Sequence, residues 1–221
     1  MDIREAMTSR HSVRNYKDLP IEAAFTEKLA EEIKACNEES GLNIQMILND
    51  PACFDTLIAH YGKFRHADNY IALVGKKDFG DLFERCGYYG ERIVLFMQTL
   101  GLRSCWVAGS YRKGKCAAEI KPDEKLVCVI SFGYGETDGV KHRSKSYEKV
   151  CDVKKEDMPG WFKNGLKAAL LAPTAINQQQ FFITLEGEEA VIRAKMGPYS
   201  KIDLGIVKYH FEAASGRHCR S

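Results

Sequence analysis

The chain of 221 residues has 32 Lys and Arg against 30 Asp and Glu, a formal net charge of +2, and 45% of its residues are hydrophobic. A dedicated nucleic-acid-binding protein usually has a much larger basic excess, so the composition argues against that class. The chain is long enough to bury a substantial core, either as one domain over residues 1–221 or as two interlocked halves, 1–150 and 151–221. No apolar run reaches the length of a membrane span, and the first ten residues lack a signal-peptide apolar region, so we expect a cytoplasmic protein with no membrane partner.

The eight cysteines are scattered, with neither a CxxC pair nor a spacing typical of metal sites. In a chain of this length without a signal peptide, we expect reduced thiols and no metal. Cys105, next to Trp106, lies in the short turn that follows the predicted central helix, so it is the cysteine considered further. A packing role for Cys105 is favoured over a nucleophilic one, because no base is visible beside it in the sequence.

In chain order, apolar periodicity and turn-forming residues predict helices at residues 2–8, 21–36, 78–100 with a break near Gly87, 157–171 and 203–214. Runs of β-branched and aromatic residues predict strands at residues 43–48, 70–74, 126–132, 181–185 and 191–196. The pattern of residues 54–66 is ambiguous, with a helix that ends near Gly62 as one interpretation.

The stretch from Gly87 to Gly109 organises these elements. Apolar side chains surround its helix almost completely between Ile93 and Leu100, which is typical of a helix inside the fold. Gly101 can end the helix in the left-handed conformation, and a short turn over residues 102–106 then leads to the small residues 107–109. One interpretation is a buried helix that presents backbone to a flat ligand; an ordinary core helix is the alternative.

Two basic clusters, Arg10–Arg14 and Lys141–Lys145, each contain a serine. Arginine presents forked donors that match phosphate oxygens, and a hydroxyl adds a further donor, so either cluster suits an anion. Both can also be solvated loops, as charged clusters usually are. They bind one phosphate only if the fold brings them together.

A late turn, residues 172–182, separates a predicted helix from a predicted strand. Pro173 ends the helix, and Thr174, Asn177 and Gln179 follow it. Uncharged amides both donate and accept hydrogen bonds, so they suit the edge of a neutral heterocycle. A capped helix-to-strand loop is the alternative interpretation.

Together these segments resemble the FMN-dependent nitroreductase family. Arg10–Arg14 (RHSVR) resembles the family's R-R-S-x-R phosphate motif, and residues 172–179 (APTAINQQ) resemble its A-P-S-x-x-N-x-Q flavin segment. Residues 101–106 (GLRSCW) resemble the G-L-G-x-x-W turn after the core helix, and Lys141–Lys145 resembles the basic pair of the phosphate clamp. The amide segment usually precedes the core helix but follows it here, and Gln180-Phe181 replaces the usual Pro-Trp. This order is similar to the permuted, thermophile-nitroreductase-like branch.

The resemblance implies an α+β nitroreductase-like fold, with a central mixed or antiparallel sheet surrounded by helices and a long buried core helix. It implies FMN as cofactor and NAD(P)H as co-substrate, with a small, flat, electron-poor acceptor such as a nitroaromatic or a quinone. The chemistry would be that of the flavin, and no side chain is expected to be catalytic. The cofactor-binding residues implied are Arg10, His11, Ser12, Arg14, Trp106, Val107, Ala108, Gly109, Arg143, Lys145, Pro173, Thr174, Ala175, Asn177 and Gln179.

These segments are expected to surround one flavin, in a homodimer or in a monomer if the permuted chain completes its own site. The main alternative function is a flavin-binding or sensing protein without turnover. A nucleic-acid role for the basic clusters is disfavoured, because the charge is near neutral and residues 141–145 contain no interleaved aromatics.

Overall fold

The structure is a computed structural model that describes residues 1–55 and 64–221, and it divides the chain into two compact units. Unit 1 comprises residues 1–9, 83–92 and 141–221, and unit 2 comprises residues 10–82 and 93–140. The units therefore interleave along the sequence, and each is described by itself below. A single domain over the whole chain stays a prediction.

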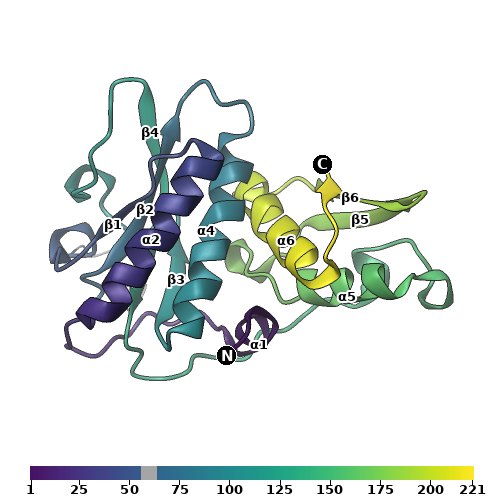
Figure 1. Cartoon of the computed structure of the whole chain (residues 1–221), viewed down its shortest axis with the longest axis horizontal. Helices are drawn as coiled ribbons and strands as arrows, with labels where there is room; N and C mark the ends of the chain where they lie inside the picture. Colours follow the sequence, from purple (N-terminus) through teal and green to yellow (C-terminus); the bar gives the residue numbers. More distant parts are fainter. Residues whose placement is uncertain (56–63) are drawn as a thin grey trace. The chain divides into compact units, whose positions relative to one another are not determined.

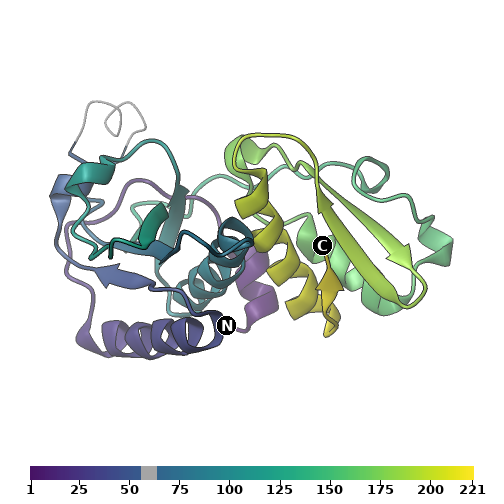
Figure 2. The same ribbon diagram turned by 90° about the horizontal axis from the view of Figure 1, so that it is seen from above.

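Unit 2 is built on a four-stranded antiparallel sheet (Figure 1). The strand order is β1 (Gln45–Ile47), β2 (Tyr70–Lys76), β4 (Glu124–Gly133) and β3 (Arg103–Val107). Helix α2 (Ala23–Ser40) lies along one face of this sheet (Figures 1 and 2). It ends at Gly41, whose φ of 69° is the left-handed conformation that closes helices.

Both faces of this sheet are buried, as β2 illustrates. Tyr70, Ala72 and Val74 point to one face and join a cluster that includes Val13 and Tyr16. Because side chains alternate along a strand, the intervening residues of β2 point to the opposite face, and they are also fully buried. The side chains of Val13 and Tyr16 are thus part of the core of unit 2, whereas Arg14 between them is exposed.

Helix α4 (Leu82–Thr99) runs without interruption through Gly87, so the predicted break there is wrong. A Cβ atom on Gly87 would lie 2.1 Å from the carbonyl oxygen of Ile202, and one on Gly205 would lie 1.9 Å from that of Glu84. Both contacts lie within unit 1. Gly87 therefore serves the close packing of α4 against α6 (Ser200–Ser215) and does not end a helix.

Unit 1 also contains α1 (Ile3–Ser9), α5 (Gly160–Ala169) and a three-stranded sheet. Strands β5 (Phe181–Glu186) and β6 (Glu189–Ala194) form an antiparallel hairpin, and β7 (Cys219–Arg220) pairs with β6 in parallel (Figure 2). Helices α5 and α6 pack together, with Phe162 and Phe211 in edge-to-face contact at 5.8 Å between ring centroids. Short 3-10 helices occur in both units. Unit 2 contains η1 (Pro51–Cys53) and η2 (Lys113–Lys115), and unit 1 contains η3 (Tyr147–Lys149), η4 (Lys155–Asp157) and η5 (Ala175–Asn177).

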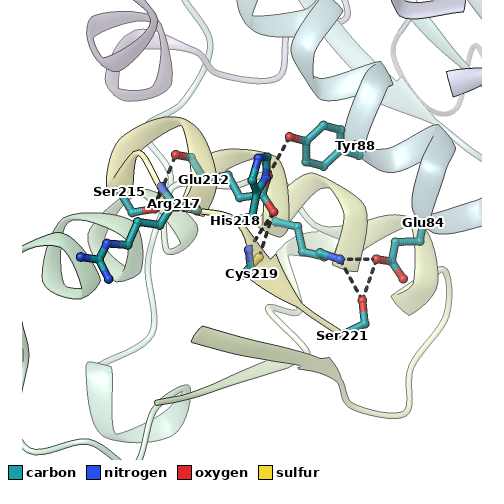
Figure 3. Close-up of polar contacts among 9 residues, drawn as sticks. Glu84, Tyr88, Glu212, Ser215, Arg217, His218, Cys219 and Ser221 are labelled. Carbon is teal, nitrogen blue, oxygen red and sulfur yellow. Dashed lines mark hydrogen bonds and ion pairs between the residues drawn. The ribbon is translucent and has the colours of Figure 1, made fainter. Parts of the chain in front are cut away.

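The segment that carries β7 is held by Glu212 of α6 (Figure 3). The Oε1 atom of Glu212 accepts from the backbone N–H of Cys219 at 3.0 Å, and Oε2 accepts from the hydroxyl of Tyr88 at 2.9 Å. His218 Nδ1 lies 2.9 Å from the same Oε2 atom. One carboxylate thus connects α4, α6 and β7 within unit 1.

The predicted helices and strands outside residues 54–66 correspond to elements of the structure. Two strands escaped the sequence analysis: residues 103–107, predicted as part of a turn, form β3, and β7 was not predicted. The uncertain helix before Gly62 falls largely on residues 56–63, outside the described part. Among the described residues, no helix has the length and apolar character needed to span a membrane.

Candidate functional site

In unit 2, the first basic cluster lies beside strand β3. Ser12 forms an isolated parallel bridge with Ser104, and the backbone N–H of Val13 donates to the carbonyl oxygen of Ser104 at 3.0 Å. Since β3 is an edge strand paired with β4 on its other side, it has backbone groups available for this contact. Two of the predicted motifs, residues 10–14 and the segment after the core helix, are therefore neighbours.

Tyr16 fixes the backbone of this cluster from inside the core. Its side chain is 1% exposed. The hydroxyl donates to the carbonyl oxygen of Val13 at 2.6 Å and lies 2.9 Å from Ser131 Oγ, which can supply a proton in return. Behind the cluster, Gly139 has a φ of 81°, and a Cβ atom there would lie 2.8 Å from the Cβ of His11. The position and direction of residues 10–14 are thus set by core packing.

Three polar side chains of this cluster converge on Cys105. Ser12 and Arg14 hydrogen-bond its thiol, and Arg10 and Arg14 act on it through their positive charge. Arg10 is 4% exposed, an unusual burial for a guanidinium group. Burial raises the pKa of Cys105 more than the arginines lower it, so Cys105 is a packed thiol and not an activated nucleophile. We refer to Arg10, Ser12 and Arg14 as the arginine cluster.

The remaining predicted residues of unit 2 lie along the same strand or next to it. His11 is half-buried, and its Nδ1 atom has no hydrogen-bond partner in the part of the chain that the structure describes. Trp106 and Val107 are the last two residues of β3 and pair with β4. Ala108 and Gly109 follow the end of the strand, and Gly109 is exposed.

In unit 1, the late polar turn has an unusual backbone. Ile176, Asn177 and Gln179 have φ values of 47°, 56° and 46°. The left-handed region is tolerated by asparagine but disfavours a β-branched residue, so Ile176 is strained. Ile176 is also 91% exposed, whereas Gln179 is 2% exposed. Pro173 is buried, and Thr174 and Ala175 are half-buried. We refer to residues 174–179 as the amide turn.

The amide turn is tied to the second basic cluster. The Nδ2 atom of Asn177 and the Nε2 atom of Gln179 donate to the carbonyl oxygen of Arg143 at 2.9 and 2.8 Å. The backbone N–H of Lys145 donates to Gln179 Oε1 at 2.8 Å. The ammonium group of Lys145 donates to the carbonyl oxygens of Gln178 and Gln179 at 2.6 and 3.0 Å. The structure therefore brings together two of the predicted motifs. Residues 143–145 and 174–179 belong to one hydrogen-bond network.

These contacts give the two cations of the second cluster different environments. The Lys145 side chain braces the amide turn through its carbonyl groups, and burial lowers its pKa, with a smaller effect from Lys195 and Lys149. Arg143 contributes its carbonyl oxygen to the same network, and the residue is exposed. A guanidinium there can meet a ligand from solvent.

Asp203 is a residue of this region that the sequence analysis missed. It lies in the first turn of α6, is 4% exposed and accepts from the backbone N–H of Ala175 at 3.0 and 3.2 Å. It also accepts from Gln178 Nε2 at 2.8 Å. Burial raises the pKa of Asp203 to about 6, although both hydrogen-bond partners act to lower it. The signal that could have revealed it is an acidic residue in the otherwise apolar run of α6.

Comparison with known proteins identifies the family. The model of the family described as "Putative TM nitroreductase" matches residues 2–215. The chain belongs to this family. A search of curated proteins found no significant match.

Solved structures of nitroreductases have the same fold. A putative nitroreductase of Thermotoga maritima superimposes with a TM-score of 0.70 at 23% identity, over 97% of this chain and 83% of that chain. A putative nitroreductase of Desulfovibrio desulfuricans, solved in complex with FMN, gives a TM-score of 0.55 at 19% identity, over 70% and 98%. A putative NADH dehydrogenase/NAD(P)H nitroreductase of Parabacteroides distasonis gives 0.54 at 19% identity, over 67% and 95%.

These matches confirm the resemblance and the predicted fold class. The matched family corresponds to the permuted, thermophile-nitroreductase-like branch that the motif order indicated. The fold is α+β and nitroreductase-like. At these identities, the structural likeness concerns the fold alone. The roles of individual residues therefore remain predictions.

Proposed function

We propose that this protein is an FMN-dependent oxidoreductase that takes hydride from NAD(P)H and reduces a flat, electron-poor acceptor such as a nitroaromatic or a quinone. Membership of a nitroreductase family supports the reaction class, and the Desulfovibrio desulfuricans neighbour, solved with FMN, supports the cofactor. The observation that carries the proposal is the arginine cluster, which gathers two guanidinium groups and a hydroxyl around one point beside β3.

The arginine cluster fits a phosphate group by its donors. Arg10 is almost completely buried, and the buried Nδ1 atom of His11 lacks a hydrogen-bond partner among the described residues. A buried ring nitrogen without a hydrogen-bond partner is costly, and a phosphate oxygen can compensate it. The forked donors of arginine also match phosphate oxygens. In this proposal Arg10, Ser12 and Arg14 bind the phosphate of FMN, and Tyr16 keeps them in position through Val13.

The donors and acceptors of the amide turn suit the neutral part of FMN. Its side-chain amides are oriented by internal hydrogen bonds, so little ordering is needed when a ligand binds. Thr174, Asn177 and Gln179 are proposed to contact the ribityl chain or the ring edge, and Arg143 is proposed to add positive charge. Lys145 is proposed to support the turn rather than to bind phosphate directly, because its ammonium is bonded to two carbonyl oxygens.

When bound, FMN would supply the hydride-transfer chemistry, and the chain would supply binding, orientation and electrostatics. Backbone at residues 107–109, at the end of β3 and directly after it, is proposed to lie next to the ring. Cys105 is not proposed to react, because its thiol is buried and its pKa is raised. We further expect a homodimer, or a monomer if one chain completes its own site, and a cytoplasmic location.

The test begins with the absorption spectrum of the purified protein after addition of FMN. We expect bound oxidised flavin, with bleaching on anaerobic addition of NADH or NADPH and recovery on addition of a quinone. Arg10→Ala with Arg14→Ala should weaken FMN binding by roughly 10²- to 10⁴-fold, since a hydrogen bond to a charged group contributes about 1.5–3 kcal/mol. Lys28→Ala with Lys34→Ala removes the same charge from an exposed face of α2 and should leave FMN affinity unchanged.

Retention of FMN by the arginine double variant at the natural affinity would contradict the phosphate assignment. Flavin that binds tightly but is not bleached by either nicotinamide would favour the alternative of a flavin-binding or sensing protein without turnover. Far-UV circular dichroism of both double variants checks that a loss of flavin does not result from unfolding.

A further inference from the structure

Two cysteines of unit 2, far apart in sequence, meet at the ends of two short helices. A hydrogen bond joins the thiols of Cys53 and Cys116. Cys53 is the last residue of η1, and Cys116 immediately follows η2. The backbones of the two segments are also in contact, because the N–H of Arg112 donates to the carbonyl oxygen of Cys53 at 2.9 Å. All eight cysteines lie in the described part of the chain, and none forms a disulfide in the structure.

The surroundings hold the two thiols in place. The hydroxyl of Tyr70 lies within hydrogen-bonding reach of both thiols. This hydroxyl also lies 2.5 Å from Asp50 Oδ2, to which it donates, and it accepts from the backbone N–H of Ala117 at 2.9 Å. Asp50 in turn caps η1 by accepting from Ala52 N at 3.1 Å. The segments that carry Cys53 and Cys116 are therefore connected through one tyrosine on the central strand β2.

The two thiols differ in access and in charge. Cys53 is completely buried, and the six cysteines outside this pair are also buried, whereas Cys116 is half-buried. The hydrogen bond from Cys53 is the main cause that lowers the pKa of Cys116 to about 6, and the same bond, together with burial, raises the pKa of Cys53. The more accessible sulfur is therefore the one that ionises more readily, and thiolates are the attacking species in disulfide exchange.

We propose that Cys53 and Cys116 form a reversible thiol–disulfide site that exchanges with low-molecular-weight disulfides of the glutathione type. The thiolate of Cys116 attacks one sulfur of the small disulfide, whose S–S bond breaks and releases one thiolate. Cys53 then loses its proton to solvent and attacks the Cys116 sulfur, which displaces the second small thiolate. The products are one intramolecular disulfide and two reduced small thiols, so the protein is oxidised by two electrons and the small disulfide is reduced.

The charge next to Cys116 suits such a reagent. Arg112, Lys113 and Lys115 precede Cys116 and are exposed. They favour the approach of a disulfide that carries carboxylate groups, such as oxidised glutathione. The new bond would link η1 directly to the segment after η2, next to the buried ring of Phe54. This proposal is independent of the flavin proposal, since neither cysteine belongs to the arginine cluster or to the amide turn.

The test treats the fully reduced full-length chain with oxidised glutathione at neutral pH, followed by acid quenching, alkylation of remaining thiols and peptide mass spectrometry. We expect a peptide pair linked through Cys53 and Cys116 that is two hydrogens lighter than the reduced pair. In Cys53→Ser, glutathione should remain attached to Cys116, because the resolving thiol is missing. In Cys116→Ser, Cys53 should stay unmodified. The Cys116 rate should exceed that of the buried cysteines by at least about tenfold.

The control variant Cys151→Ser, in the other unit, should form the Cys53–Cys116 bond at the natural rate. Circular dichroism checks the fold of each variant, and Cys53→Ala replaces Cys53→Ser if the serine is not tolerated in the core. A stable mixed disulfide on Cys116 in the natural chain, faster reaction at another cysteine, or no reaction at all would overturn the proposal.

Discussion

Asp203 gives a pH-dependent prediction whose size follows from the structure. Its carboxylate is 4% exposed and receives hydrogen bonds from Ala175 and Gln178, both in the amide turn. Burial nevertheless dominates and raises the pKa of Asp203 from 3.8 to about 6. The folded protein therefore binds this proton more tightly than the unfolded chain does.

The sign of the effect follows from this difference. A carboxyl whose pKa is raised by folding contributes stability that is fully present below its unfolded pKa and is lost as the pH rises through its folded pKa. For Asp203 the window runs from about pH 4 to about pH 6. A difference of about 2 pKa units corresponds to roughly 3 kcal/mol in the free energy of unfolding.

Asp203→Asn removes the titration and keeps one oxygen acceptor for the N–H of Ala175. Urea unfolding of both proteins between about pH 4 and about pH 7 gives the free energy of unfolding of each. As the pH rises, the free energy of unfolding of the natural protein should fall by up to roughly 3 kcal/mol relative to that of Asp203→Asn. Glu188→Gln, an exposed carboxylate of the β5–β6 turn, is the matched control and should show a constant difference. A constant difference for Asp203→Asn as well would refute the reasoning.

Other changes test the packing around the two regions. Gly205→Ala should lower the free energy of unfolding by more than about 3 kcal/mol, because its Cβ would lie 1.9 Å from a backbone oxygen. Gly160→Ala is the control, because the space around Gly160 is open, and its melting temperature should stay close to that of the natural protein. Glu91→Ala should cost about 1–3 kcal/mol in urea unfolding, because it removes the hydrogen-bond partner 2.8 Å from the buried Nε2 atom of His210, and Glu91→Gln should cost less. Tyr16→Phe should cost about 1–3 kcal/mol and weaken FMN binding, since it removes the hydroxyl that holds residues 10–14.

The sequence predicted most elements because their apolar spacing is strong, and it failed where the signal depends on neighbours. The segment 103–107 mixes an arginine, a serine and a cysteine with apolar residues, so its pattern does not indicate a strand. It becomes β3 because β4 offers a long apolar edge with which it pairs. Gly87 was read as a helix breaker, but its lack of a side chain is used for contact with α6. That use depends on a residue more than a hundred positions later.

The candidate site shows the same division between residue type and geometry. Donor chemistry pointed to residues 10–14 and 174–179 as candidate binding segments, and their role remains a prediction. The bridge from Ser12 to Ser104 and the bonds from Asn177 and Gln179 to Arg143 join segments that only tertiary structure brings together. The sequence could not show that the ammonium of Lys145 donates hydrogen bonds to backbone carbonyl oxygens, because a lysine in a basic cluster is equally compatible with the role of a phosphate ligand.

The strain in the amide turn is the strongest structural reason to treat it as a functional element. Left-handed backbone at a residue other than glycine costs on the order of 1–3 kcal/mol, and a β-branched residue is among the least suited to it. Ile176 nevertheless adopts this conformation while almost completely exposed, so its own packing does not repay the cost. Within unit 1, the turn is held because it donates hydrogen bonds to Asp203 and to the carbonyl oxygen of Arg143 and accepts one from Lys145. A turn needed only to connect α5 to β5 could use glycine there, whereas a turn that presents Asn177 to a ligand benefits from being fixed before the ligand arrives.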